Sequence, residues 1–268
     1  MPNVSDVCEF LKSRAPVEMK MDFDNVGLLV GFGGADASKM LLSLDITHDV
    51  ITEAIDIGAG LIVSHHPLFF ELKSVTDADV TGRKVVRLLS GGLSAICMHT
   101  NLDAAIGGTN DALAAAIGIA RDGEPASLLS HDGTLVHTGQ AFSYGRFGEL
   151  ENPLPMSEFL PFLKDTLRSR GLRYHDAGKP VHRVAVVGGS GGSDLHHAVA
   201  KGCDTFLTAD IKYDVFLDAK ELGINLIDGD HFCTENLVIA PLAKSLRAAF
   251  PDATVTVSLT HGQTARFI

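Results

Sequence analysis

Short apolar runs alternate with amphipathic, helix-like segments along most of the chain. Runs such as Leu61–Ser64 and Leu93–Met98 carry no charged residue and have the length of buried strands. Between them, Val50–Ile57 and Thr81–Leu89 place apolar side chains at helical spacing. Strands that alternate with helices in this way predict an α/β protein.

The remaining elements follow from the same pattern. Helices are predicted over residues 4–11, 109–117, after Pro155, over 194–201, 213–222 and near 235–249. Further strands are predicted at 40–46, 184–187, 205–208, 225–227 and 254–258, with a β-rich stretch at 135–147. Pro241 falls inside the last helical pattern and is expected to kink or interrupt it.

Two segments resemble each other at a constant spacing. Ala54–Ser64 and Ala198–Thr208 each read as a helix that ends at a glycine and leads into a buried strand. In both parts another helix and strand then lead to a histidine, His99 in the first and His231 in the second. We therefore predict two related α/β lobes.

Three polar clusters each follow a predicted strand. Ligands of open α/β sheets bind beyond the carboxyl ends of the strands, so these clusters lie where a site is expected. Pro67 can force a turn that lets adjacent histidines converge. A histidine and a glutamate four residues apart share one face of a helix. The candidate residues are His65 and His66 in the first cluster, His99 and Asp103 in the second, and His231 and Glu235 in the third.

Each cluster alone also has an ordinary explanation. The paired histidines fit an exposed loop, Asp103 fits a cap before a glycine turn, and Glu235 fits a helix start favoured by the helix dipole. Together they offer a mixed set of imidazoles and carboxylates that suits Zn, Mn, Fe or Co. Five ligands with two carboxylates exceed what one catalytic zinc uses, so we predict two divalent ions.

Other polar features give weaker signals. The glycine-rich stretch Val187–Ser193 is interpreted as a tight turn lining a pocket, with phosphate binding at a helix N-terminus as the alternative. Asp45 follows an early strand, where capping a helix is favoured over supporting a metal ligand. His99 is the candidate proton shuttle, because an imidazole titrates near neutral pH; a role in orienting a neighbouring group is the alternative.

Composition excludes several classes of protein. The net charge of −11 opposes a broad nucleic-acid surface, which depends on clustered Lys and Arg. The N-terminal residues lack a signal-peptide pattern, and no apolar run approaches the length of a membrane span. Four cysteines without a Cys-x-x-Cys pair are typical of reduced thiols, so we expect a cytoplasmic protein without membrane or nucleic-acid partners.

The motifs, taken together and in order, resemble those of the GTP cyclohydrolase 1 type 2 homologues, which are dinuclear-metal, toroidal hexameric proteins. The length is similar to that of the short bacterial form. The matching segments are Asp24–Gly31 (DNVGLLVG), Ser64–Phe69 (SHHPLF), His99–Asp103 (HTNLD), Val187–Gly191 (VGGSG) and Gly229–Glu235 (GDHFCTE). Three positions depart from the family pattern. Asp230 is an extra residue before His231, and Ala209 and Asp214 stand where the family commonly has a glycine and a histidine.

The resemblance implies two interlinked α/β domains with mixed sheets flanked by helices. We place the first, with most metal ligands, at residues 1–127 plus 229–268, and the second at 128–228. It also implies a homohexamer built as a trimer of dimers. The metal ligands it implies are His65, His66, Asp103, His231 and Glu235.

The expected activity is metal-dependent hydrolysis of a nucleotide or a cyclic amide, and the family name suggests opening of the guanine imidazole ring of GTP. A non-catalytic hexamer that stores, delivers or senses metal ions, or that scaffolds a partner, is the alternative. The same ligands serve both functions.

Overall fold

The computed structural model describes residues 1–120 and 126–268. These residues form two compact units, unit 1 with Met1–Ala105 and Ile239–Gly262, and unit 2 with Ile106–Val238 and Gln263–Ile268. The units differ from the predicted domains, because residues 106–120, 126–127, 229–238 and 263–268 belong to unit 2. The apolar side chains of these segments, such as Leu113 and Cys233, are buried in a core of unit 2, which explains the difference. Residues 121–125, part of the predicted boundary, lie outside the described residues.

Unit 1 contains one sheet in the order β1-β4-β3-β2-β13, in which β1 is antiparallel to β4 and the other neighbours are parallel. Its strands are β1 (Gly27–Val30), β2 (Lys39–Ser43), β3 (Leu61–Ser64), β4 (Ser94–Cys97) and β13 (Thr254–Val257). Its helices are α1 (Val4–Arg14), the 3-10 helix η1 (Val17–Met19), α2 (His48–Asp56), α3 (Val80–Ser90), α4 (Thr100–Ala104) and α10 (Ile239–Ala249).

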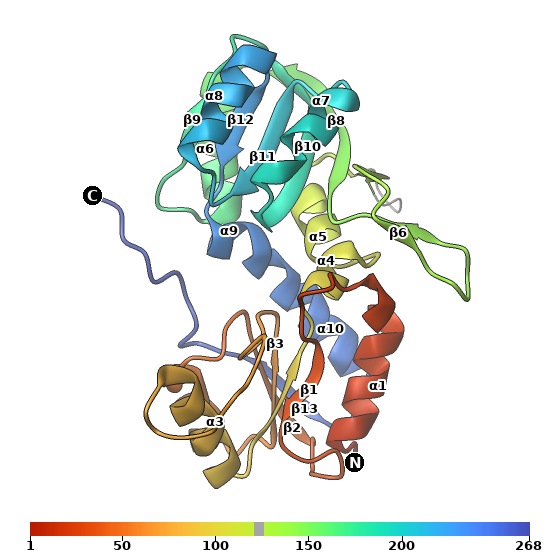
Figure 1. Ribbon diagram of the computed structural model, residues 1–268, viewed down its shortest axis with the longest axis vertical. Helices are drawn as coiled ribbons and strands as arrows, with labels where there is room; N and C mark the ends of the chain where they lie inside the picture. The colour runs from red at the N-terminus through yellow and green to blue at the C-terminus, as the bar shows by residue number, and fades with distance from the viewer. Residues whose placement is uncertain (121–125) are drawn as a thin grey trace. The chain divides into compact units, whose positions relative to one another are not determined.

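Side chains alternate between the two faces of this sheet. Leu41 and Ile62 point to the face covered by α2 and α3, and α1 lies on the other side of the sheet from α3 (Figure 1). Helix α2 starts where the Thr47 hydroxyl accepts a hydrogen bond from the N–H of Val50. The chain leaves α2 through Gly58, whose φ of +67° is typical of the glycine that ends a helix.

Unit 2 contains a six-stranded mixed sheet in the order β5-β8-β10-β11-β12-β9 and a small β6-β7 hairpin. The strands are β5 (Ser127–Leu128), β6 (Gly133–Thr134), β7 (Ala141–Phe142), β8 (Arg146–Leu154), β9 (Arg173–His175), β10 (Val181–Ser190), β11 (Thr205–Ala209) and β12 (Asn225–Asp228). The helices are α5 (Thr109–Ala116), α6 (Met156–Leu167), η2 (Gly192–Asp194), α7 (Leu195–Ala200), α8 (Tyr213–Leu222), α9 (His231–Glu235) and η3 (Asn236–Val238).

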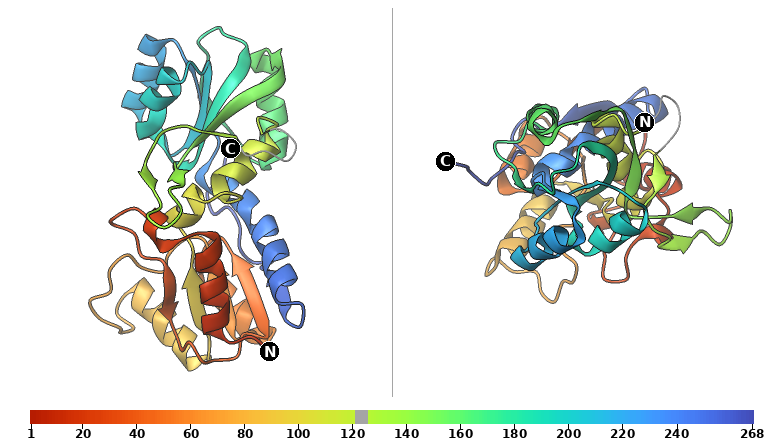
Figure 2. Two further views of the ribbon diagram at one scale, coloured as in Figure 1. Left: turned by 90° about the vertical axis from the view of Figure 1, so that its right-hand side faces the viewer. Right: turned by 90° about the horizontal axis from the view of Figure 1, so that it is seen from above.

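Two apolar cores cover the two faces of the larger sheet. Val184 and Val186 of β10 point into a core with α5 and α6. Ala185 and Val187 of the same strand point into a core with α7 and α8. The left view of Figure 2 shows α7 and α8 on one side of this sheet and α6 on the other. Burial on both faces explains why the central strands carry almost uninterrupted apolar runs.

The two units share a repeated topology. In unit 1, β2, α2, β3, α3 and β4 follow one another, and the three strands are parallel neighbours. In unit 2, β10, α7, β11, α8 and β12 repeat this order with the same parallel pairing. The predicted fold of two related α/β lobes with mixed sheets flanked by helices is confirmed. Within each unit, the carboxyl ends of three parallel strands meet at one edge of the sheet.

The predicted helix over residues 235–249 is divided in the structure. Helix α9 ends at Glu235, η3 follows, and α10 begins at Ile239. Pro241 therefore lies in the first turn of α10, where its missing N–H costs no helical hydrogen bond. The interruption comes before the proline rather than at it.

The described residues also bear on membrane association and on the state of the thiols. No helix within residues 1–120 and 126–268 combines the length and the apolar character needed to cross a bilayer. All four cysteines are buried free thiols.

A carboxylate of α2 holds the chain that follows β13. Glu53 accepts hydrogen bonds from the N–H of Leu259 at 2.8 Å and from the hydroxyl groups of Ser258 and Thr260 at 2.5 and 2.7 Å. Burial raises the pKa of Glu53, but these hydrogen bonds to its ionised form outweigh burial and lower the pKa below its usual value of 4.5.

We expect Glu53→Gln to lower the free energy of unfolding by about 1 kcal/mol at neutral pH, because a neutral amide accepts hydrogen bonds more weakly than a carboxylate. A lowered folded-state pKa contributes stability above the unfolded-state pKa, and this contribution is lost as the pH falls through the folded-state pKa. The variant and the wild type should therefore converge in acid. Urea unfolding across this pH range measures the effect.

The matched control is Asp56→Asn, which changes an exposed carboxylate at the end of the same helix. This control should change the unfolding free energy by less than about 0.5 kcal/mol. Equal stability of Glu53→Gln and wild type at neutral pH would contradict the role of Glu53.

Candidate metal centre

Three histidines gather at the carboxyl ends of β3 and β4. His65 and His66 directly follow β3, and His99 follows β4 as the residue before α4. The ring centroid of His65 lies 5.1 Å from that of His66 and 5.3 Å from that of His99. Each of the three residues offers a ring nitrogen, and these atoms lie within 4.8 Å of one another, close enough to hold one metal ion.

A turn after β3 lets the adjacent histidines converge. Neighbouring residues of an extended strand point to opposite faces, so a continuing strand would separate the rings. Instead, the hydroxyl of Ser64 donates to the carbonyl of His66 at 2.8 Å, and the N–H of His66 donates to the carbonyl of Leu44 at 2.9 Å. Pro67 lies directly after this turn.

Asp103 reaches the same cluster from α4. Its carboxylate is 9% exposed, and one oxygen lies 3.4 Å from Nε2 of His65. Helix α4 begins at Thr100, shortly after β4 ends at Cys97, which places Asp103 one turn beyond His99. An oxygen donor next to imidazole nitrogens is the mixed environment that divalent transition metals prefer.

In both His65 and His66, the ring nitrogen Nδ1 forms a hydrogen bond with an oxygen atom. Nδ1 of His65 donates to the backbone carbonyl of Met98 at 2.9 Å, because a carbonyl can only accept. Nδ1 of His66 lies 2.7 Å from a carboxylate oxygen of Asp45 and donates to it. Asp45 therefore supports a candidate ligand, and the cap of α2 comes from Thr47, so the predicted capping role of Asp45 is wrong.

His99 is fixed by the buried carboxylate of Asp24. Nδ1 of His99 lies 2.9 Å from Oδ1 of Asp24, and the N–H of Thr100 donates to Oδ2 at 3.0 Å. Burial raises the pKa of Asp24, but hydrogen bonds from His99 and Thr100 outweigh burial and lower the pKa to about 2. Asp24 is therefore ionised at neutral pH, and Nδ1 of His99 is the donor.

Unit 2 supplies two further candidate ligands. His231 and Glu235 lie four residues apart on α9, with Nε2 of His231 3.1 Å from a carboxylate oxygen of Glu235. Nδ1 of His231 lies 2.7 Å from a carboxylate oxygen of Asp210. Asp230, the extra residue of the motif, caps α9 by accepting from the N–H of Cys233 at 3.1 Å. His231 is thus the first residue of the helix and shares a face with Glu235.

The glycine stretch after β10 packs directly against this pair. A Cβ on Gly189 would lie 2.1 Å from a carboxylate oxygen of Glu235 and 3.2 Å from Cε1 of His231. Gly189 also has a φ of +63°, and its N–H donates to the hydroxyl of Thr234 at 3.1 Å. The glycine is required by both backbone conformation and close packing, which agrees with a tight turn lining a site.

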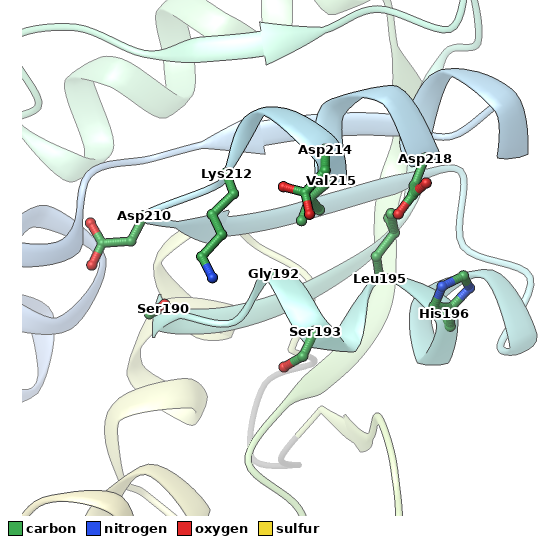
Figure 3. A pocket seen from close by; sticks show the side chains of 10 residues that line it. All are labelled: Ser190, Gly192, Ser193, Leu195, His196, Asp210, Lys212, Asp214, Val215 and Asp218. Carbon is green, nitrogen blue, oxygen red and sulfur yellow. The ribbon is translucent and has the colours of Figure 1, made fainter.

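A pocket of about 390 Å³ opens in unit 2 beyond the ends of β10 and β11. This volume is within the usual range for small-molecule sites. Figure 3 shows Lys212 extending toward the Ser190–Gly192 turn, with Asp214 and Asp218 on α8. Asp210 lines the same pocket, so one carboxylate borders the pocket and supports His231. Asp214 also lines this pocket.

The predicted ligands thus fall into two sets. His65, His66 and Asp103 come together inside unit 1 with His99, the candidate proton shuttle, and His231 and Glu235 come together inside unit 2. Sequence reasoning did not assign roles to Asp24 and Asp210, which orient His99 and His231. Each is a carboxylate beside a strand end at the sheet edge that carries the histidines, and this position was the available signal.

Fold and site together define a protein of two related α/β units, with imidazole and carboxylate groups that could hold a metal ion. Comparison with known families gives a narrower assignment. The chain matches the family model described as Duf34/NIF3 (NGG1p interacting factor 3) over residues 2–265 and belongs to this family.

Curated relatives and solved structures agree. A "GTP cyclohydrolase 1 type 2 homolog" of Clostridium acetobutylicum is 34% identical over 248 residues, which cover 92% of this chain and 90% of the relative. A hypothetical protein of Staphylococcus aureus has a structure with a TM-score of 0.89 at 26% identity, with full coverage of both chains. A Bacillus cereus protein related to NIF3 shares the fold, with a TM-score of 0.92 at 22% identity over 100% of this chain and 99% of its own. The family resemblance seen in the motifs is confirmed.

We expect Gly189→Ala to lower the free energy of unfolding by about 3 kcal/mol, since the new methyl group combines an unfavourable φ with a clash against Glu235. Gly178→Ala is the matched control in unit 2, because Gly178 has a φ of +74° and open space around its Cβ position. The free energy of unfolding of Gly178→Ala should fall by about 1 kcal/mol, because only the backbone conformation is unfavourable there. Denaturant unfolding compares the two variants, and equal losses would contradict the packing role of Gly189.

Proposed function

We propose that the chain is a metal-dependent hydrolase with a dinuclear metal centre. The observation that carries the proposal is the hydrogen-bonding state of the histidines. Nδ1 of His65, His66 and His231 lies within hydrogen-bond distance of an oxygen that can accept its proton, which would leave Nε2 of each ring to bind a metal ion. This orientation by carboxylates and carbonyls is the usual environment of metal-binding histidines. The proposed ligands are His65, His66, Asp103, His231 and Glu235.

The donor set supports two ions rather than one. Three imidazoles and two carboxylates exceed the three protein ligands of a typical catalytic zinc site. Their mixture of nitrogen and oxygen suits Zn, Fe, Mn or Co, and the carboxylates offset the positive charge of two cations. We propose that these five residues hold two ions, as the family resemblance implies.

Divalent ions held by these residues would polarise a substrate and lower the pKa of water. The protein residues would orient the reaction. Asp24, which is ionised, would stabilise positive charge on the ring of His99 when the ring accepts a proton. His99 is therefore proposed as the residue that moves a proton during hydrolysis.

The proposed substrate is a nucleotide or a cyclic amide. Support comes from the relative's name, GTP cyclohydrolase 1 type 2 homolog, and from the polar pocket beside Asp210, which has room for a small molecule. We also propose a homohexameric assembly, a trimer of dimers forming a toroid, on the basis of the family resemblance. The four free cysteines support a cytoplasmic location.

We expect the wild type, loaded with Mn, Fe, Co or Zn, to retain two ions per chain, and Asp103→Asn and Glu235→Gln each to lose at least one of them. Mass spectrometry of metal content on the dialysed protein measures this. The control is His197→Ala, which changes an exposed histidine on α7 and should retain both ions. Unchanged metal content in both carboxylate variants would refute the proposed centre.

We expect His99→Gln to lower kcat about 100-fold or more while metal content stays unchanged, because proton transfer by a positioned side chain contributes about this much. The loaded protein is assayed on GTP, other nucleoside phosphates and cyclic amides. Loss of metal from His99→Gln would make His99 a ligand instead. A wild type that binds both ions but turns over no substrate in these classes would favour the non-catalytic metal-binding hexamer.

A further inference from the structure

Two exposed phenyl rings lie beside the histidine cluster of unit 1. Phe23 is 62% exposed and Phe70 is 52% exposed. Their ring centroids lie 5.7 Å apart with an interplanar angle of 66°, so the edge of one ring faces the other. The ring of Phe70 also lies 6.0 Å from the ring of His99. An apolar surface thus borders a strongly polar site.

The segments that carry these rings also carry the site. Phe23 directly precedes Asp24, whose carboxylate fixes His99. Phe70 lies in the long connection between β3 and α3, which begins with His65 and His66. The side-chain amide of Asn25 donates to the carbonyl of Phe69 at 3.1 Å and ties the two segments together. The backbone that carries the two rings is therefore tied to the turns that position the histidines.

We propose that Phe23 and Phe70 form the wall that binds a flat, unsaturated ring of the substrate, and so determine substrate specificity. This inference rests on the proposed function, because it assumes that the substrate approaches the histidine cluster. Aromatic rings bind one another edge-to-face or offset, with centroids about 4.5–7 Å apart. The contact between Phe70 and His99 places the apolar wall next to the polar group that would meet the reacting atoms. A small planar ring fits this arrangement better than an aliphatic chain, which lacks the electrostatic complementarity of ring edges and faces.

The test uses two probes that present the same metal-binding group. Benzohydroxamate carries a phenyl ring where acetohydroxamate carries a methyl group. The ratio of their dissociation constants therefore isolates the contribution of the ring contact. Titration of the cobalt-loaded full-length protein, followed by its visible absorption, measures both constants. We expect the wild type to bind benzohydroxamate about tenfold or more tightly than acetohydroxamate.

The variants Phe70→Leu and Phe23→Leu should lose most of this preference while their affinity for acetohydroxamate stays unchanged. The matched control is Phe32→Leu, because Phe32 is 72% exposed and follows the other end of β1, away from the histidines. This control should keep the wild-type preference. Leucine retains an apolar side chain, so the comparison isolates the aromatic ring.

The outcomes separate the two proposals. Equal affinity of the wild type for both hydroxamates would overturn the aromatic wall and leave the metal centre intact. Failure of the protein to bind cobalt would refute the proposed centre on which the wall depends, and metal analysis alone would reveal that result.

A preference that survives in both Phe70→Leu and Phe23→Leu would also overturn the assignment. If these variants instead change only the mass of the assembly in light scattering, the rings belong to an interface between copies, and the proposal is wrong.

Discussion

The buried carboxylate of Asp24 is the interaction on which the geometry of unit 1 depends. An ionised carboxylate is costly to bury unless donors surround it, and here the donors are the ring of His99 and the backbone and hydroxyl of Thr100. These donors lie at the start of α4, so the carboxylate fixes the direction of this helix. Asp103 on the same helix is thereby placed against His65. One side chain orients a histidine and also positions a candidate ligand.

The repeated topology explains why polar residues collect at one edge in each unit. Parallel strands joined by helices all end at the same edge, so the turns after them are neighbours. The two units use this edge differently. In unit 1 the turn after β3 carries two imidazoles, whereas in unit 2 the turn after β11 carries Asp210. The turn after β10 carries glycines that let the backbone approach Glu235 closely. The related halves have thus diverged in the chemistry of equivalent turns.

Local patterns in the sequence predicted most of the fold. Short runs without a charged residue marked β3, β4 and β11, because these strands are buried on both faces. His65, His66 and His99 were recognisable because they follow such runs. The histidine that each of Asp24 and Asp210 orients was not predicted, since each pairing is a contact between residues that are distant in the chain. The unit boundaries also depend on tertiary packing, because the apolar face of α5 does not specify the sheet that it covers.

The position of β13 has a consequence for synthesis of the protein on the ribosome. This strand comes from the last part of the chain and pairs with β2, which forms near the beginning. The outer edge of β2 stays open until residues 254–257 emerge, and an open edge of this kind invites pairing with other chains. Nearly all of unit 2, residues 106–238, emerges before that moment. The nascent chain can therefore complete most of the second half while the first half still lacks an edge strand, a period in which chaperones would protect it.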